Sequence, residues 1–388
     1  MSNVYGLKPG EIDFQSRAAI LASRELAEYA ADVDVNARFP GESVGALARE
    51  GFLGLCVPKE FGGSGQGPRV FAAVAEELAQ GCCSTAMIFV MHVSAAQALA
   101  SSTTLGRKTE VLRQIAKGEH LTTLAFSERG SRSHFWAPVS ALSEIDGAYA
   151  VSAQKSWVTS ASHADSYVAS SQKPGAASPL ESTIYLINRN NRGVKVQSRF
   201  DGLGLRGNDS APVLFENVPV AVGDLISALG EGAGTMMNVV LPWFNVGTAA
   251  MANGVGRSAM TATAAHLQRS EFTHVRTSLR DLPTLRARLA DMNVRLEQAR
   301  AFLGYTLGEI ENPSDTTVPF VLQTRLASIE AAIEVTDLAM KACGGAAFSR
   351  HLPVERMFRD ARAGWVMAPT ADHLREFLGR ILTGLPLF

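Results

Sequence analysis

The chain has 388 residues, 46% hydrophobic and 19% charged, which is enough for a large buried core in two or three domains. Its formal net charge of −1 gives no electrostatic case for binding nucleic acid or an anionic membrane. No apolar run approaches the roughly 18–20 residues that span a bilayer, and the first residues lack a signal-peptide pattern. The four cysteines form no CxxC pair, so we expect neither a metal site nor disulfides, and a reducing cytoplasm.

Residues 1–120 are predicted to form an N-terminal helical domain. Apolar residues recur at helical spacing over 16–37, and 40–65 reads as a helix closed by a Gly-rich turn. The apolar stretch 69–102 is expected to be helical, with a break near Gly81.

Residues 121–228 change to short β-type runs and are predicted to form a small antiparallel β domain. The runs lie in 148–172, 183–198 and 211–220, and Asp-Gly and Asn-Asn-Arg-Gly turn sequences occur between them. Helical spacing returns from 229 to 388, where four long helices are expected to form a bundle. The expected fold class is therefore α+β, in the order helical, β, helical.

Two stretches of the β domain carry candidate ligand-binding residues. The loop 124–135 offers the hydroxyls of Ser127 and Ser133, although an ordinary polar loop would have the same composition. Trp157 and Thr159 stand at alternate positions of a predicted strand, so they are expected to face one side. A flat ring cofactor with a hydrogen-bonding edge would fit there, and so would simple core packing.

Two stretches of the expected bundle carry further candidates. Arg269 and Phe272 are three residues apart, which predicts one helical face that could hold a pyrophosphate or an adenine. The alternative is an exposed Arg beside a buried Phe. Gly344 and Gly345 follow a helix, where they predict a C-cap or a close backbone approach to a diphosphate.

The order of these motifs resembles that of the acyl-CoA dehydrogenase family of flavoproteins over nearly the whole chain. EGFLGLCVPKEFGGSG and EELAQGCCSTA resemble its N-terminal helical signature, and SERGSRSH resembles its Thr-Glu-Pro-Gly-Ala-Gly-Ser-Asp loop. KSWVTSASHAD resembles its Lys-x-Trp-Ile-Thr-Asn strand, and GLGLRGNDSAPVLFENVPV the segment that closes the β domain. RSEF resembles its helix motif, and ACGGAAF with PVERMFRDAR its Gly-Gly and Arg-Asp-Ala segments.

The resemblance implies a flavin-dependent oxidoreductase with FAD held non-covalently between the β domain and the bundle. The implied cofactor-binding residues are Phe126, Ser127, Ser133, Trp157, Thr159, Arg269, Phe272, Gly344, Gly345 and Thr370. In the family the helix motif and the paired glycines hold the FAD of an adjacent subunit, so the resemblance also implies a homotetramer or homodimer. An anionic diphosphate favours an Arg and free N–H groups, which agrees with these residue types.

Position 368 departs from the family pattern. In the family a Glu, the base that removes the α-proton of an acyl thioester, stands seven residues after Arg-Asp-Ala. Here Ala368 is the seventh residue after Ala361, and Pro369 replaces the following Gly. Some members carry the base on the first bundle helix, but the stretch 239–256 contains no acid or His.

Three hypotheses follow for the activity. In the first, the enzyme acts on an acyl thioester of coenzyme A or an acyl carrier protein, with a relocated base or redox-neutral chemistry. In the second, it is a flavin monooxygenase of the same fold acting on an aromatic substrate, with a flavin reductase or electron-transfer partner. His92 and His134 are the candidate catalytic residues, although His92 could equally be a satisfied core histidine. In the third, it is an inactive FAD-binding partner subunit.

Overall fold

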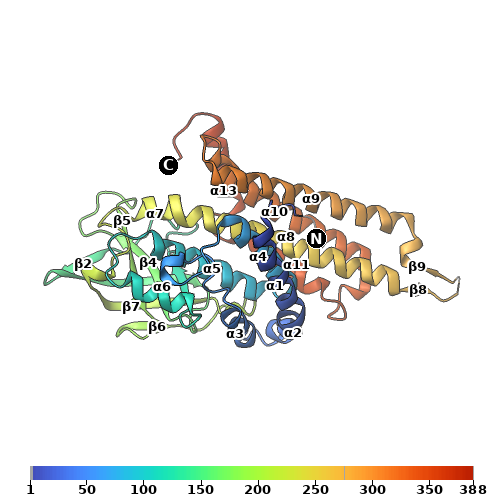
Figure 1. Ribbon diagram of the computed structural model, residues 1–388, viewed down its shortest axis with the longest axis horizontal. Coiled ribbons are helices and arrows are strands. Elements are labelled where there is room, and N and C mark those ends of the chain that lie inside the picture. Colours follow the sequence, from blue (N-terminus) through green and yellow to red (C-terminus); the bar gives the residue numbers. More distant parts are fainter. Residues whose placement is uncertain (1–2, 275, 388) are drawn as a thin grey trace.

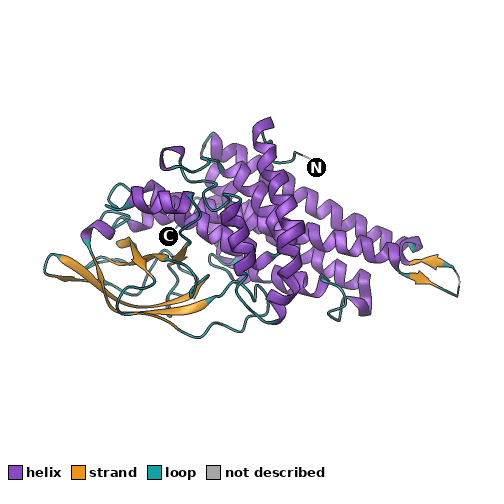
Figure 2. Ribbon diagram, turned by 60° about the horizontal axis from the view of Figure 1, so that its bottom comes forward, coloured by secondary structure: helices purple, strands orange, loops and turns teal. Residues whose placement is uncertain are grey.

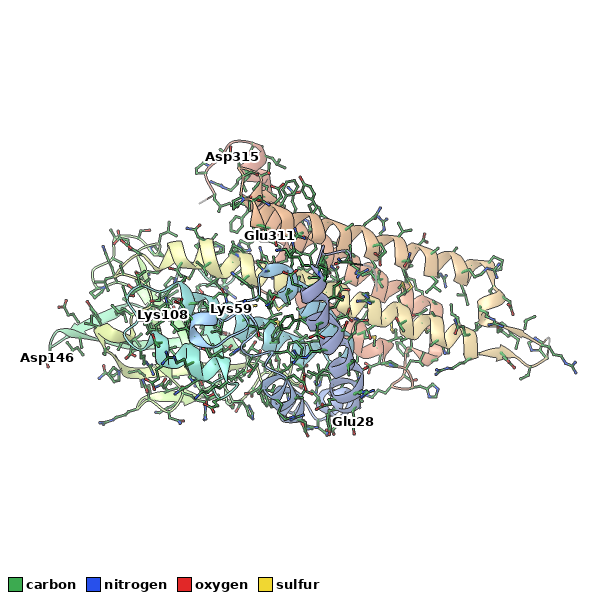
Figure 3. The ribbon with its side chains drawn as sticks, in the orientation of Figure 1. Glu28, Lys59, Lys108, Asp146, Glu311 and Asp315 are labelled. Atoms are coloured by element: carbon green, nitrogen blue, oxygen red, sulfur yellow. The ribbon has the colours of Figure 1, made fainter. Side chains whose placement is uncertain are left out.

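The computed structural model describes residues 3–274 and 276–387 and shows an elongated molecule with a β domain at one end (Figure 1). Helices gather in one mass, and the two larger sheets lie beside its left end (Figure 2). The exposed side chains of Asp146 and Glu28 project outward from the β domain and from the N-terminal helices (Figure 3). The helical, β, helical order expected from the sequence is confirmed.

The N-terminal helices follow the apolar spacing of the sequence. They are α1 (Pro9–Leu21), α2 (Ala27–Val35), α3 (Gly41–Arg49), α4 (Pro68–Gly81), α5 (Cys83–Ser101) and α6 (Lys108–Ala116), with a π-helical turn at Ala22–Leu26 between the first two. The predicted break near Gly81 is confirmed, because Cys82 has extended backbone angles (φ −149°, ψ 112°) that no helix tolerates.

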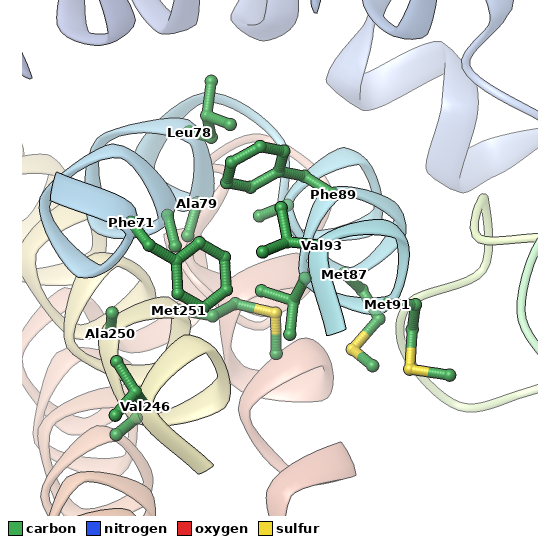
Figure 4. Packing of buried hydrophobic residues seen from close by; sticks show 14 of the residues in the cluster. Phe71, Leu78, Ala79, Met87, Phe89, Met91, Val93, Val246, Ala250 and Met251 are labelled. Carbon is green, nitrogen blue, oxygen red and sulfur yellow. The ribbon is translucent and has the colours of Figure 1, made fainter. Parts of the chain in front are cut away.

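Helix α5 corrects one statement made from the sequence. Its 19 residues have a mean hydropathy of 1.4, so by length and composition it could cross a membrane. However, 89% of this stretch is buried inside the protein, so α5 is a buried core helix. Phe71 of α4, Phe89 of α5 and Met251 of the later helix α8 (Leu241–Arg269) belong to the same core cluster (Figure 4).

The middle segment forms two sheets packed around their own core. Their strands are β1 (Thr122–Ala125), β2 (Leu142–Ile145), β3 (Ala148–Val158), β4 (Ser166–Gln172), β5 (Ser182–Asn188), β6 (Val194–Val196) and β7 (Ala211–Val220). The strand orders are β1-β4-β5 and β2-β3-β7-β6. β1 pairs with β4 in parallel, so the expectation of a purely antiparallel domain is wrong at this pair. The chain leaves the first sheet after β1, builds the β2–β3 hairpin in the second sheet, and returns as β4.

The C-terminal segment contains three long helices and several short ones. They are α7 (Gly232–Thr235), α8 (Leu241–Arg269), α9 (Pro283–Glu311), α10 (Thr317–Cys343), α11 (Val354–Ala361), α12 (Ala363–Val366) and α13 (Ala371–Leu382), with a small hairpin of β8 (Glu271–Phe272) and β9 (Thr277–Ser278). The fourth helix, α13, has 12 residues, so the expectation of four long helices is wrong for it. The unpaired thiols of Cys56, Cys82, Cys83 and Cys343 are all buried.

Contacts from α11 join the three parts of the chain. The Arg359 guanidinium lies 2.6 Å from the Asp34 carboxylate of the N-terminal helices. It also donates to the carbonyl of Leu203, in the segment between β6 and β7. The neighbouring Asp360 accepts a hydrogen bond of 2.7 Å from the backbone N–H of Leu205. These bonds fix the β domain against the helices, and the candidate site lies along this junction.

Candidate active site

A buried ion pair fixes the loop that follows β1. The carboxylate of Glu128 lies 2.6 Å from Nζ of Lys155, and both side chains are buried. Glu128 also accepts hydrogen bonds from the backbone of Val139 and Ser140, at the far end of the same loop. Burial opposes the charged form, but Lys155 and Ser140 outweigh it and hold the pKa of Glu128 below its usual range. Glu128 therefore ties both ends of the loop to strand β3.

The predicted side-by-side arrangement of Trp157 and Thr159 is wrong. Trp157 is 60% exposed, whereas Thr159 is 3% exposed and follows the end of β3. Trp157 has a left-handed backbone (φ +56°), and the β3–β7 register shifts between Lys155 and Val158. The bulge breaks the alternation on which the prediction depended. The Trp157 ring instead stacks on Phe200, with ring centroids 3.8 Å apart.

This end of β3 has the features that a flavin ring would use. Trp157 presents a large exposed aromatic surface, and the hydroxyl of Ser160 is buried with no hydrogen-bond partner among the described residues. An unsatisfied buried hydroxyl costs roughly 1–3 kcal/mol, so a polar ligand edge at this point would be stabilising. Phe126 is buried and Ser127 is half-buried at the start of the adjacent loop. These residues fit a flat ring with polar edges.

A buried arginine fixes the loop that contains Ala368. Arg325 of α10 is fully buried and donates 3.0 Å to the carbonyl of Met367 and 3.1 Å to Oδ1 of Asn245. Its Nε has no partner, and no carboxylate pairs with it among the described residues. Burial without a counter-ion lowers its pKa. The loop is therefore held at its backbone, while Ala368 offers only a methyl group.

Two histidines bridge the β1–β2 loop and α13. Nε2 of His134 lies 2.9 Å from Nε2 of His373, and the rings meet edge to face. Nδ1 of His373 lies 2.8 Å from Oγ1 of Thr370, which also caps α13 by accepting from the His373 amide. Thr370, placed by resemblance among the cofactor-binding residues, thus lies in a chain of polar groups two residues from Ala368.

Aromatic rings surround the histidine pair. The His134 ring lies 5.0 Å from that of Trp136, and Trp136 lies 5.2 Å from both Phe135 and Phe377. Phe135 in turn lies 6.4 Å from Phe126. The rings form a continuous apolar wall from the end of β1 to α13. Ser133, half-buried, adjoins this wall in the same loop.

His92 lies in the core rather than at this junction. It is fully buried in α5, and Nε2 lies 3.0 Å from the carbonyl of Leu53. Nδ1 accepts a hydrogen bond of 3.1 Å from the amide of Thr122. Burial lowers the pKa of His92 to about 4, so the neutral ring is stable. Both ring nitrogens are engaged by backbone, and we assign His92 the structural role that the sequence left open.

The remaining candidates lie at the opposite end of the bundle. Arg269 is the last residue of α8 and Phe272 lies in β8, so the predicted shared helical face is wrong because the helix ends between them. Gly344 has a left-handed φ of +57° and ends α10, which confirms the C-cap. The hairpin of β8 and β9 lies far from the β domain (Figure 1). Within one chain, these residues do not meet Trp157 or Ala368.

Two residues of the site were missed by sequence reasoning. They are His373 of α13 and Arg325 of α10. The Thr-x-x-His spacing of Thr370 and His373 was a usable signal, because a side chain at that position can reach back to a capping threonine. No local signal marks Arg325, because its role depends on a carbonyl 42 residues away in sequence.

Comparison with known proteins gives matches over most of the chain. Family models described as the acyl-CoA dehydrogenase N-terminal, middle and C-terminal domains match residues 9–119, 123–218 and 230–383. The mitochondrial short-chain specific acyl-CoA dehydrogenase of Bos taurus is 27% identical over 355 residues, covering 90% of this chain and 84% of that protein.

Solved structures share the fold. Butyryl-CoA dehydrogenase from Megasphaera elsdenii superposes with a TM-score of 0.91 at 21% identity, covering 97% of this chain and 99% of that one. The FAD complex of PigA superposes with a TM-score of 0.90 at 20% identity, covering 97% and 98%.

Proposed function

Because the chain belongs to the acyl-CoA dehydrogenase family, we propose that it is an FAD-dependent oxidoreductase that acts on an acyl thioester without the family's carboxylate base. FAD, expected from the sequence, is the cofactor of this family of flavin-dependent oxidoreductases, and the PigA complex shows it bound to the same fold. We propose coenzyme A or an acyl carrier protein as the carrier of the acyl group.

One observation carries the proposal. The loop that would hold the base is fixed by a buried arginine, but its position 368 has no acidic side chain. Arg325 holds the backbone at Met367, directly before Ala368. The loop of Ser127 is likewise fixed by Glu128 and Lys155. A protein that had lost its chemistry altogether would gain nothing from burying an unpaired Arg beside this position, because such burial is costly.

Different residues at the junction would contact the flavin ring and exclude water from it. Trp157 and the Ser127 loop would hold the flavin ring, and the aromatic wall from Phe126 to Phe377 would exclude water beside it. FAD held there would supply the acceptor for one hydride, which carries the two electrons of the oxidation. A proton that leaves the substrate must then go to a group of this chain other than residue 368.

We further propose a homo-oligomer in which Arg269, Phe272, Gly344 and Gly345 reach the FAD of a neighbouring copy. The β8–β9 hairpin, at the end of α8, lies at the end of the molecule away from the β domain, which supports this (Figure 1). Reoxidation would require an electron-accepting protein partner or another acceptor, and we propose a cytoplasmic location.

Anaerobic flavin reduction tests the proposed function. The FAD-loaded protein is mixed with butyryl-, octanoyl- or 3-phenylpropionyl-CoA, and bleaching of the flavin absorbance is followed with and without an artificial electron acceptor. At least one thioester should bleach the flavin. Dithionite serves as the control for a reducible flavin. If dithionite bleaches the flavin and none of the thioesters, free or on a carrier protein, does so, the proposed function is wrong.

A further inference from the structure

The histidine pair between the β1–β2 loop and α13 can hold only a limited number of protons. The two Nε2 atoms of His134 and His373 lie 2.9 Å apart, so one must donate and the other must accept. If both nitrogens carried a proton, two N–H groups would point at each other without an acceptor. The pair therefore behaves as one proton-binding unit that takes up a single extra proton.

The hydrogen bond between His373 and the capping Thr370 links the positions of the protons on the two rings. When His134 donates through Nε2, His373 accepts at Nε2 and carries its own proton on Nδ1, which donates to Thr370. In that arrangement Nδ1 of His134 has an unprotonated lone pair. In the reverse arrangement the Thr370 hydroxyl donates to His373 and the proton sits on Nδ1 of His134. A proton accepted by His134 can thus be passed toward His373.

The open end of the unit is available to a ligand. His134 is exposed, and its Nδ1 makes no hydrogen bond with any described residue. The other end is fixed through Thr370, two residues after Ala368, and the same loop is anchored by Arg325 at Met367. The unit therefore lies beside the loop from which the acid is missing.

We propose that His134 is the proton acceptor that replaces a carboxylate at position 368, and that His373 positions and assists it. This inference rests on the proposed function. In the step, the Cα–H bond of the acyl thioester breaks and its proton goes to Nδ1 of His134. The electron pair of that bond becomes the second bond between Cα and Cβ, and the Cβ–H bond breaks with its electrons leaving as a hydride, which bound FAD would accept. The thioester is oxidised by two electrons, and the protein gains one proton.

The surroundings of the pair suit this role. Burial, and then a positive charge on His134, lower the pKa of His373, whereas Asp372 and Glu376 of the same helix raise it. On the loop side, Trp136 is the neighbouring ring, and it carries no charge. A neutral His373 at physiological pH can accept the proton that His134 donates, so His134 is kept in its basic arrangement.

Deuterium exchange tests the inference separately from hydride transfer. FAD-loaded protein is incubated with butyryl-, octanoyl- or 3-phenylpropionyl-CoA in D₂O without oxygen, and deuterium at the α-carbon is measured by mass spectrometry. His134→Gln keeps a donor near His373 but has no basic nitrogen, so the exchange rate should fall by about 10²–10⁴-fold. His373→Gln should give a smaller loss. His351→Gln, an exposed histidine elsewhere, is the matched control.

The outcomes separate the two proposals. Exchange and bleaching that persist in His134→Gln would overturn the inference and leave the proposed function intact. Absence of both in the wild-type protein would overturn both. FAD content and melting temperature of each variant show whether a loss reflects unfolding. If His134→Gln does not fold, His373→Gln decides, because its exchange rate must then fall and its pH profile must shift.

A second readout needs no turnover. In protein labelled with ¹⁵N-histidine, the ring nitrogens of His134 and His373 report their protonation by NMR. Replacing His373 by Gln should shift the titration curve of His134, because the two rings share one proton. An unchanged His134 titration would show that the rings are not coupled and would contradict the inference.

Discussion

A methyl group at position 368 cannot accept a proton, so restoring an acid there should add a second base. Wild-type protein, with no acid at this position, should dehydrogenate saturated acyl-CoAs more slowly than a variant that has one. In Ala368→Glu, activity should rise in part, since burial beside the half-buried loop raises the pKa of the new carboxyl toward a useful range. The double variant Ala368→Glu with Pro369→Gly should be more active than Ala368→Glu alone, because Pro369 fixes φ at about −65° and restricts where the new side chain can point. Flavin bleaching with an artificial acceptor measures the gain.

Robust wild-type turnover that is insensitive to any change at residue 368 would contradict this prediction. Ala368→Gln is the matched control, because it has the size of Glu without a titratable group. A gain in the Gln variant equal to that in the Glu variant would assign the effect to shape instead of proton transfer.

The carboxyl of Asp360 gives a pH-dependent prediction. Burial raises its pKa to about 6, above the ordinary value of roughly 3.9 in the unfolded chain. The stability that this group contributes is therefore full below pH 4 and is lost as the pH rises through 6. Asp360→Asn keeps an acceptor for Leu205 and does not titrate. Its stability relative to wild type should increase by about 1 kcal/mol between pH 5 and 7.5 in urea unfolding. A pH-independent difference would show that Asp360 keeps an ordinary pKa.

At the scale of single elements, close helix packing makes a strong prediction for α4 and α8. A Cβ on Gly254 would lie 2.3 Å from the carbonyl oxygen of Glu76 and 2.7 Å from Cβ of Ala79. Gly254→Ala should therefore destabilise the protein by about 1–3 kcal/mol, measured by denaturant unfolding. Gly379→Ala in α13 is the control, because no atom of the residues that the structure describes lies within 4 Å of a Cβ built there; it should be neutral or stabilising by up to about 1 kcal/mol.

The β1–β2 loop depends on one buried ion pair. Lys155→Met would leave the Glu128 carboxylate buried without a counter-ion, which should cost about 3–5 kcal/mol in thermal unfolding. The loop should then hold FAD and His134 less firmly. The double change Glu128→Gln with Lys155→Met removes the stranded charge and should recover part of the stability. If the single change is as stable as the double, the pair does not fix the loop.

Helices were predictable where apolar spacing alone decides, as in α1, α4 and α10. Predictions that assumed regular continuation failed. A left-handed residue at Trp157 ended the strand alternation, and the end of α8 at Arg269 separated it from Phe272. At Trp157 a tertiary contact, the stacking on Phe200, accompanies the departure, whereas after Arg269 the chain enters the local β8–β9 hairpin.

At the scale of the whole molecule, the cofactor-binding candidates form two groups. The group around Trp157 lies at the β-domain end, and the group around Arg269 and Phe272 lies at the other end, by the β8–β9 hairpin (Figure 1). FAD binding should therefore depend on association. Arg269→Ala should weaken FAD binding by roughly 1.5–3 kcal/mol while leaving the junction around Trp157 intact. Light scattering combined with the flavin absorbance gives both quantities. A stable monomer with full FAD content would contradict the neighbour's role.

The absence of an acid at position 368 could be predicted from the sequence, because the resemblance fixes that position seven residues after Arg-Asp-Ala. The histidine pair could not, because His134 and His373 are 239 residues apart and meet only after the β domain docks on α13. The role of Arg325 could not be predicted either, because it depends on a carbonyl 42 residues away in sequence. Sequence patterns thus identified what the site lacks, whereas the groups beside the gap became visible only through long-range contacts.

The four buried cysteines provide a built-in measure of how the protein opens. Burial raises the pKa of each thiol, so the reactive thiolate is rare while the fold is closed. Alkylation at any one of them therefore requires local opening. Cys56 reports on the N-terminal helices, Cys82 and Cys83 on the junction of α4 and α5, and Cys343 on the end of α10. The order in which the thiols become modified would rank these regions by their opening free energies.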